Sequence, residues 1–128
     1  MRRMRVGRII AGGFLLELLL ILVLVPPLQL IGPDRVIPWI GPAVAILSFG
    51  FAWWFLHKVS YRPVLHGALI GILATAIYIL LCFANPDGIG AVVAMYGLFG
   101  FIVGNALRIA GCMAGGYMVT RRTVTSSR

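Results

Sequence analysis

The chain has 128 residues, which is enough for a single domain. Hydrophobic residues make up 61% of it and charged residues 11%, against about 25% charged residues in an average soluble domain. This composition leaves too little polar surface for a soluble domain and therefore indicates a protein whose surface faces lipid. The net charge of +8 raises the question of nucleic-acid binding. The basic residues flank apolar stretches and form no stripe mixed with aromatic side chains, so we expect no nucleic-acid partner.

Four apolar stretches predict four transmembrane helices, at about residues 9–25, 39–56, 64–83 and 89–119. A spanning helix needs about 20 residues, and lipid offers no partners to unpaired backbone groups, so helices are expected throughout. Pro26 and Pro27 close the first stretch, and a turn sequence at residues 85–88 closes the third. We therefore expect an all-α membrane four-helix bundle, formed by residues 1–128 as one domain.

The first stretch has an alternative interpretation as a signal peptide, because an arginine-rich start precedes it. However, the sequence that follows it, Val25-Pro26-Pro27-Leu28-Gln29-Leu30, contains no cleavage site of the small-x-small type. We therefore expect it to remain as a membrane span.

The fourth stretch is too long for a straight crossing. A continuous helix over residues 89–119 would reach roughly 46 Å, whereas the hydrocarbon core is about 30 Å thick. The helix must tilt, project beyond the bilayer or break, and Gly97, Gly100 and Gly104 are the candidate positions for a kink. We expect its first turns to lie at the outer interface.

The distribution of basic residues predicts the orientation. Of the 11 Lys and Arg residues, nine lie at the two ends or in the loop after the second stretch: Arg2, Arg3, Arg5, Arg8, Lys58, Arg62, Arg121, Arg122 and Arg128. The opposite side carries only Arg35, and Arg108 lies inside a span. Because cytoplasmic loops carry an excess of Lys and Arg, both termini are predicted to be cytoplasmic (N-in, C-in), in a bacterial inner membrane.

Two charged residues lie within spans. Glu17 is roughly 13 Å from Arg8 by helical rise, and Arg108 is roughly 20 Å from Arg121. Small residues recur at three- to four-residue spacing along each span, including Gly97, Gly100, Gly104, Gly111 and Gly115 in the fourth. This spacing is typical of helix contacts and places both charges on packing faces. We therefore hypothesise an ion pair between Glu17 and Arg108 that joins the first and fourth spans.

Asn105 and Thr75 complete a candidate intramembrane polar cluster with Glu17 and Arg108, and Tyr78 is a further polar partner on the third span. Two interpretations remain open. The cluster is either a structural contact or a binding site for a proton or substrate. A neighbouring arginine argues against Glu17 as a simple proton carrier.

We find no motif for catalysis, a cofactor or a metal ion, and we expect no enzymatic activity. His57 and His66 flank the loop between the second and third spans, with no cysteine or acidic residue nearby to complete a metal site. Both are expected to face lipid headgroups. The remaining partners that we expect are the bilayer itself, a second copy of the chain or another membrane protein.

Two short motifs carry resemblances. The segment from Gly50 to Lys58, followed by residues 62–71 with the sequence Arg-Pro-Val-Leu-His-Gly-Ala-Leu-Ile-Gly, resembles small four-span bacterial inner-membrane proteins with no assigned activity. The resemblance covers about a fifth of the chain, and its paired glycine appears at Gly115–Gly116 rather than in the second span. It implies a bacterial inner-membrane location.

The second resemblance is to small multidrug resistance transporters. Residues 12–17, Gly-Gly-Phe-Leu-Leu-Glu, are similar to the first span of that family, which carries an essential glutamate. The resemblance implies a small-solute or proton-coupled transporter centred on Glu17. Arg108 departs from the pattern, and the one-sided charge distribution departs from the antiparallel dimers of that family. The leading prediction is therefore a non-enzymatic accessory, structural or assembly protein, and the alternative is a transporter.

Overall fold

The computed structural model describes residues 4–127. Within them the chain forms four helices in sequence order, α1 (Val6–Leu30), α2 (Pro33–Leu56), α3 (Pro63–Ala84) and α4 (Gly88–Thr125). All four are long and apolar enough to cross a membrane. The fold is the predicted all-α membrane four-helix bundle.

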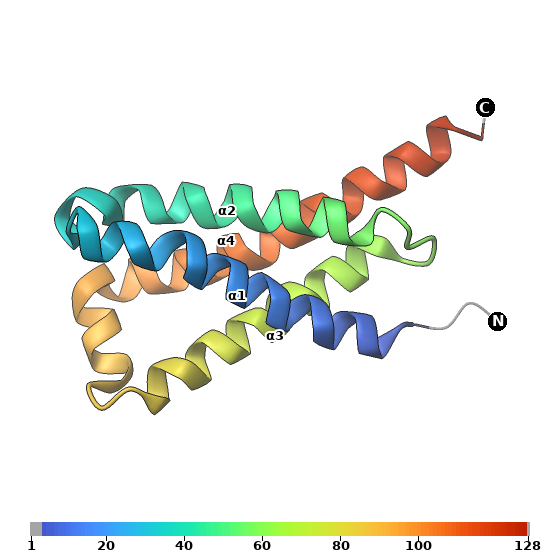
Figure 1. Ribbon diagram of the computed structural model, residues 1–128. Coiled ribbons are helices and arrows are strands. Elements are labelled where there is room, and N and C mark those ends of the chain that lie inside the picture. The colour runs from blue at the N-terminus through green and yellow to red at the C-terminus, as the bar shows by residue number, and fades with distance from the viewer. Residues whose placement is uncertain (1–3, 128) are drawn as a thin grey trace.

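The helices run back and forth, so the connections alternate between two ends of the bundle (Figure 1). One end, which we call the terminal end, holds both chain termini and the connection at residues 57–62. The other end, the distal end, holds the turns at residues 31–32 and 85–87. Helix α4 packs extensively against both α2 and α3, and α1 packs mainly against α3. The basic residues that the sequence analysis grouped on one side, as far as the structure describes them, thus share the terminal end.

At the distal end, α1 and α2 extend beyond the apolar stretches that predicted them. Helix α1 continues through Pro26 and Pro27 to Leu30 instead of closing there. Each proline removes one backbone N–H donor, but transmembrane helices tolerate prolines where the freed groups find other partners. Helix α2 begins at Pro33 rather than near Trp39, because proline is favoured in the first helical turn. The two helices therefore project further at the distal end than hydrophobicity indicates.

The turn between α1 and α2 is very short and depends on a glycine. Gly32 has φ +100°, a conformation that side chains with a Cβ atom rarely adopt. This conformation reverses the chain directly before Pro33.

Helix α4 breaks at Gly97, where φ is 73° and ψ is 157°. The segment before the break lies across the distal end, and the longer segment after it runs the length of the bundle (Figure 1). Of the three alternatives for the long fourth stretch, the structure shows a break, and it lies at the candidate Gly97, whereas Gly100 and Gly104 remain helical. A single crossing therefore starts after the break, which resolves the excess length of the fourth stretch.

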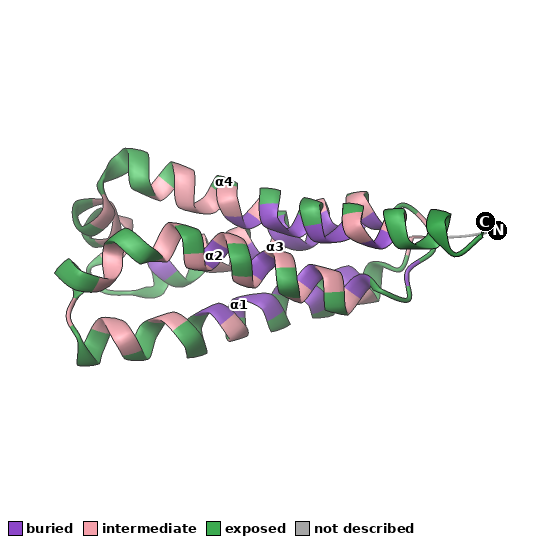
Figure 2. Ribbon diagram, turned by 90° about the horizontal axis from the view of Figure 1, so that it is seen from above, coloured by how far each residue is buried: buried purple, intermediate pink, exposed green. Residues whose placement is uncertain are grey.

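The buried residues gather in the half of the bundle near the terminal end, and the distal half is mostly exposed or intermediate (Figure 2). The largest fully buried side chains are Leu16, Leu20, Leu56, Ile70, His66, Cys112 and Ser48. Helices in lipid gain little from hydrophobic burial against each other, so close backbone approach must hold this half together.

The glycines of α4 near the terminal end provide that close approach. A Cβ atom added to Gly111 would lie 2.7 Å from the backbone oxygen of Ala45, and one added to Gly115 would lie 2.6 Å from that of Phe49. On the other side, a Cβ atom on Gly67 of α3 would overlap the carbonyl group of Cys112. The backbone of α4 therefore touches the backbones of both neighbours.

The distal glycines of α4 do not pack in this way, although their spacing predicts helix contacts. A Cβ atom on Gly104 would meet no other described atom within 4 Å, and one on Gly100 would meet only the side chain of Tyr96 from its own helix, at 3.6 Å. The helices diverge on this side, so the small residues border open space instead of a neighbour.

Candidate functional site

Glu17 of α1 and Arg108 of α4 face each other inside the bundle. Oε2 of Glu17 lies 3.3 Å from Nη1 of Arg108, and the two side chains are only 4% and 7% exposed. The structure thus brings together the two charged residues that helical rise placed at similar depths. The pair lies where the tightly packed half of the bundle ends.

Arg108 also contacts α3, so its side chain links three helices. Its Nη1 donates a hydrogen bond of 3.4 Å to the backbone oxygen of Ala74, and its guanidinium lies 4.7 Å from the ring centroid of Tyr78. The ring face of tyrosine carries partial negative charge and attracts a cation. Tyr78 is therefore the polar partner on α3 that the sequence analysis named, and it acts through its ring.

The ion pair leaves hydrogen-bonding capacity unused. Within residues 4–127, Oε2 of Glu17 and Nε of Arg108 are fully buried and have no hydrogen-bond partner. At 3.3 Å the two charges attract each other, but the geometry does not form a hydrogen bond. A buried acceptor and a buried donor without partners are costly and require an explanation.

The other two members of the predicted cluster lie nearby without joining the pair. The amide Nδ2 of Asn105 donates to the backbone oxygen of Phe101 on its own helix, at 2.9 Å. The hydroxyl of Thr75 is buried and makes no hydrogen bond with any described residue. The structure therefore joins Glu17 and Arg108 directly, whereas Asn105 bonds within its own helix and the Thr75 hydroxyl makes no hydrogen bond with a described residue.

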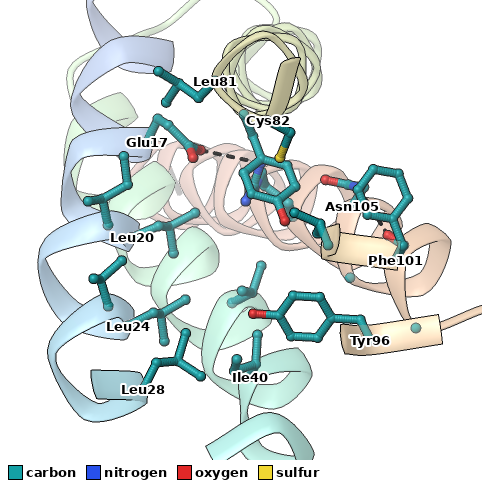
Figure 3. A pocket seen from close by; sticks show the side chains of 18 of the residues that line it. Glu17, Leu20, Leu24, Leu28, Ile40, Leu81, Cys82, Tyr96, Phe101 and Asn105 are labelled. Atoms are coloured by element: carbon teal, nitrogen blue, oxygen red, sulfur yellow. Dashed lines mark hydrogen bonds and ion pairs between the residues drawn. The ribbon is translucent and has the colours of Figure 1, made fainter. Parts of the chain in front are cut away.

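A cavity of about 360 Å³ extends from the ion pair toward the distal end (Figure 3). All four helices line it. The row of leucines on α1 forms one wall, and Tyr96 and Phe101 of α4 lie opposite (Figure 3). Glu17, Arg108 and Asn105 contribute to its polar inner end. The cavity exists because the break at Gly97 and the bare surface at Gly100 and Gly104 leave space where side chains would otherwise meet.

His66 is a buried polar residue that the sequence analysis assigned wrongly. It was expected to face headgroups, but it is 1% exposed. Its Nδ1 lies 3.0 Å from the backbone oxygen of Arg62, and its Nε2 accepts a bond of 3.4 Å from the backbone N–H of Arg5. These partners favour the neutral ring with the proton on Nδ1. His57, in contrast, is exposed, and its Nδ1 contacts the backbone oxygen of Trp54.

The contacts of His66 tie the start of α1 to the start of α3. Arg62, directly before α3, has a left-handed backbone with φ 45°, unusual for a residue with a side chain. Its carbonyl accepts bonds from both the backbone N–H and Nδ1 of His66, at 3.1 and 3.0 Å, which hold this conformation. The sequence carries one signal for this contact. A histidine follows Arg62 by four residues, in the first turn of a predicted helix.

Basic side chains hold the terminal end of α2. Nη2 of Arg8 donates to the backbone oxygen of Phe55 at 3.1 Å, and the guanidinium of Arg122 lies 4.5 Å from the ring centroid of Trp53. A cation near the last carbonyls of a helix is stabilising, because these carbonyls carry partial negative charge. Some of the charges that predict topology therefore also make structural contacts.

Across residues 4–127, no group of three or more His, Cys, Asp or Glu side chains is placed to hold a metal ion. The chain matches no protein-family model, no curated protein sequence and no solved structure. The two resemblances to known families therefore remain predictions from short motifs, and the geometry of the ion pair and the cavity is the basis for a functional proposal.

Proposed function

We propose that this chain is a non-enzymatic accessory or assembly protein of the bacterial inner membrane, with both termini in the cytoplasm. The observation that carries the proposal is the buried ion pair between Glu17 and Arg108. Glu17 and Arg108 are the charged residues that lie within the predicted spans. They contact each other between helices rather than facing solvent.

The pair supports a structural role because each charge is already compensated. Arg108 lies 3.3 Å from the carboxylate of Glu17 and supplies its counter-charge, which disfavours binding of a transported proton or cation there. Removing one partner of a buried pair leaves an uncompensated charge and costs about 3–5 kcal/mol. Such a contact fixes the depth of α1 relative to α4, which suits a unit that keeps one shape while it packs against other membrane proteins.

The short connections support the same proposal. The helices are joined only by residues 31–32, 57–62 and 85–87, so the described chain has no room for a soluble domain. Large apolar side chains remain exposed on the outer faces of all four helices, for example Phe14, Trp54, Leu80 and Phe99. Contacts with partners would therefore form within the bilayer, through these faces.

The distribution of basic residues supports the cytoplasmic location of the termini. The terminal end carries Arg5, Arg8, Lys58, Arg62, Arg121 and Arg122 among the described residues, and the distal end carries Arg35. A fluorescent protein fused after Arg128 should therefore fluoresce, and alkaline phosphatase at the same position should be inactive. The opposite pattern would reverse the proposed orientation.

The accessory role is tested by chemical crosslinking in native membranes followed by purification in mild detergent. We expect a discrete complex of defined stoichiometry with another membrane protein or with a second copy of the chain. Reconstituted vesicles should show no proton or solute flux above empty vesicles. A monomer without partners, or a flux that Glu17→Gln abolishes, would contradict the proposal.

One observation favours a second candidate, a small-solute or proton-coupled transporter centred on Glu17. The cavity of about 360 Å³ reaches this carboxylate from the distal end. Transport would require the ion pair between Glu17 and Arg108 to open when the substrate binds and to close again when it leaves. The flux measurement with Glu17→Gln as the control distinguishes this candidate from the accessory role.

A further inference from the structure

We propose that the distal cavity is a binding site for a neutral hydrophobic molecule with one hydroxyl group, such as a medium-chain alcohol or a phenol. The hydroxyl would lie at the Glu17–Arg108 pair, and the apolar part would lie along the leucines of α1. This inference goes beyond the accessory role and does not depend on it.

The walls determine that the ligand is mainly apolar. Leu20, Leu24 and Leu28 point into the cavity from α1, and Ile40 lies beside them from α2 (Figure 3). Small-molecule sites have this character, with predominantly apolar walls and a few polar groups that set orientation. A ligand of this kind would enter from the membrane, where apolar molecules are concentrated.

The volume limits the size of the ligand. The cavity volume of about 360 Å³ lies at the low end of the range of small-molecule sites, about 300–1,000 Å³. A transmembrane helix from a partner protein is far too large, and a complete diacyl lipid is also too large.

The inner end determines the polar group. Glu17 and Arg108 both line the cavity, and small parts of their side chains, 4% and 7%, remain exposed. A hydroxyl group accepts one hydrogen bond and donates another, so one such group can accept from the guanidinium and donate to the carboxylate. A water molecule could make the same two bonds, but it would leave the apolar remainder of the cavity unfilled.

Charge balance favours a neutral ligand. The carboxylate and the guanidinium compensate each other at 3.3 Å. An anionic ligand would add a second negative charge beside Glu17, and a cationic ligand would add a second positive charge beside Arg108. An uncompensated charge is costly in a site screened from water. The pair therefore selects against both kinds of charged amphiphile.

The inference is tested with the full chain in lipid nanodiscs and a photoreactive analogue of 1-decanol that carries a diazirine on its chain. Labelled peptides are identified by mass spectrometry, and four unlabelled compounds with the same chain compete: 1-decanol, decane, decyl sulfate and decyltrimethylammonium. We expect saturable labelling of α1 and α4 around the cavity. 1-Decanol should compete about tenfold better than the other three, because it gains hydrogen bonds to charged groups.

Two matched glycine variants locate the site. Gly104 lines the cavity, whereas Gly50 is exposed on α2 and does not, and a Cβ atom at either position would meet no other described atom within 4 Å. Gly104→Leu should therefore fill the cavity and abolish most of the labelling. Gly50→Leu adds the same side chain to an outer face and should leave labelling unchanged.

A third variant tests the polar end. Glu17→Gln leaves Arg108 without its counter-charge, so decyl sulfate should become a better competitor than 1-decanol. Equal competition by decane and 1-decanol on the unchanged protein would overturn recognition of the hydroxyl. Stronger competition by decyl sulfate on the unchanged protein would show an anionic ligand instead. Labelling that survives Gly104→Leu would overturn the site itself.

Discussion

Helix α4 carries closely spaced glycines in both the terminal and the distal half of the bundle, but they have different surroundings in the two halves. Near the terminal end, Gly111 and Gly115 lie against the backbone of α2, where a Cβ atom would come within 2.7 Å of a carbonyl oxygen. Toward the distal end, Gly100 and Gly104 of the same helix border the cavity. In this protein a glycine-rich span therefore makes a close contact in one half and open space in the other.

The ion pair marks the boundary between the halves. Arg108 lies between the two groups of glycines along α4, and its side chain reaches Glu17 on α1 and Ala74 on α3. The buried residues gather on its terminal side, and on its distal side the residues are mostly exposed or intermediate (Figure 2). The pair thus closes the packed half and forms the floor of the cavity.

The largest loss of stability is expected when the ion pair at the boundary is broken. Arg108→Gln and Glu17→Gln should each lower the free energy of unfolding by about 3–5 kcal/mol, because each leaves a buried charge without its partner. Unfolding in nanodiscs or mixed micelles, followed by circular dichroism, measures the loss. The double variant should lose less than the sum of the two single losses. Strictly additive losses would show that the two side chains do not interact.

The next effect compares the two groups of glycines directly. Gly115→Leu should lower the free energy of unfolding by about 3 kcal/mol, since a larger side chain would force α2 and α4 apart. Gly104→Leu inserts the same side chain into open space and should change it by less than about 1 kcal/mol. The same unfolding measurement applies to both. Similar losses for the two variants would show that the two halves do not differ in how closely their helices pack.

A somewhat smaller effect is expected at the terminal end. His66→Ala removes the ring that bonds Arg62 and Arg5 and should cost about 2 kcal/mol, as expected for hydrogen bonds lost from a buried site. Hydrogen exchange of the first turns of α1 and α3 should increase, because these turns lose their mutual contact. His57→Ala, at an exposed position, is the control and should alter neither quantity by much. If exchange rises equally in both variants, the ring of His66 does not connect the two helices.

The smallest expected effect is at the break in α4. Gly97→Ala places a Cβ atom at φ 73° and ψ 157°, a conformation open essentially to glycine alone, and should cost at least about 1 kcal/mol. Part of the helix would straighten to relieve the strain, and photolabelling in the cavity by the 1-decanol analogue should fall. Gly90→Ala lies in the same distal segment with open space around it and is the matched control. Unchanged labelling in Gly97→Ala would show that the break does not shape the cavity.

The sequence by itself determined the membrane character, the four helices and the grouping of the basic residues. It also placed Glu17 and Arg108 at similar depths. These features depend on hydrophobicity and on the constant rise of a helix, both of which can be counted along the chain. That the fourth stretch must tilt, project beyond the bilayer or break followed from its length alone.

Only the tertiary structure decided which residues meet. The rotation of each helix about its axis and its separation from the others are not set by local sequence, because they result from packing against the neighbouring helices. For this reason Gly111 and Gly104 look equivalent in sequence but lie in opposite environments, and His66 is buried instead of facing headgroups. The cavity beside Glu17 exists for the same reason. Divergence between helices is a property of their arrangement, and the residues that line the opening come from all four of them.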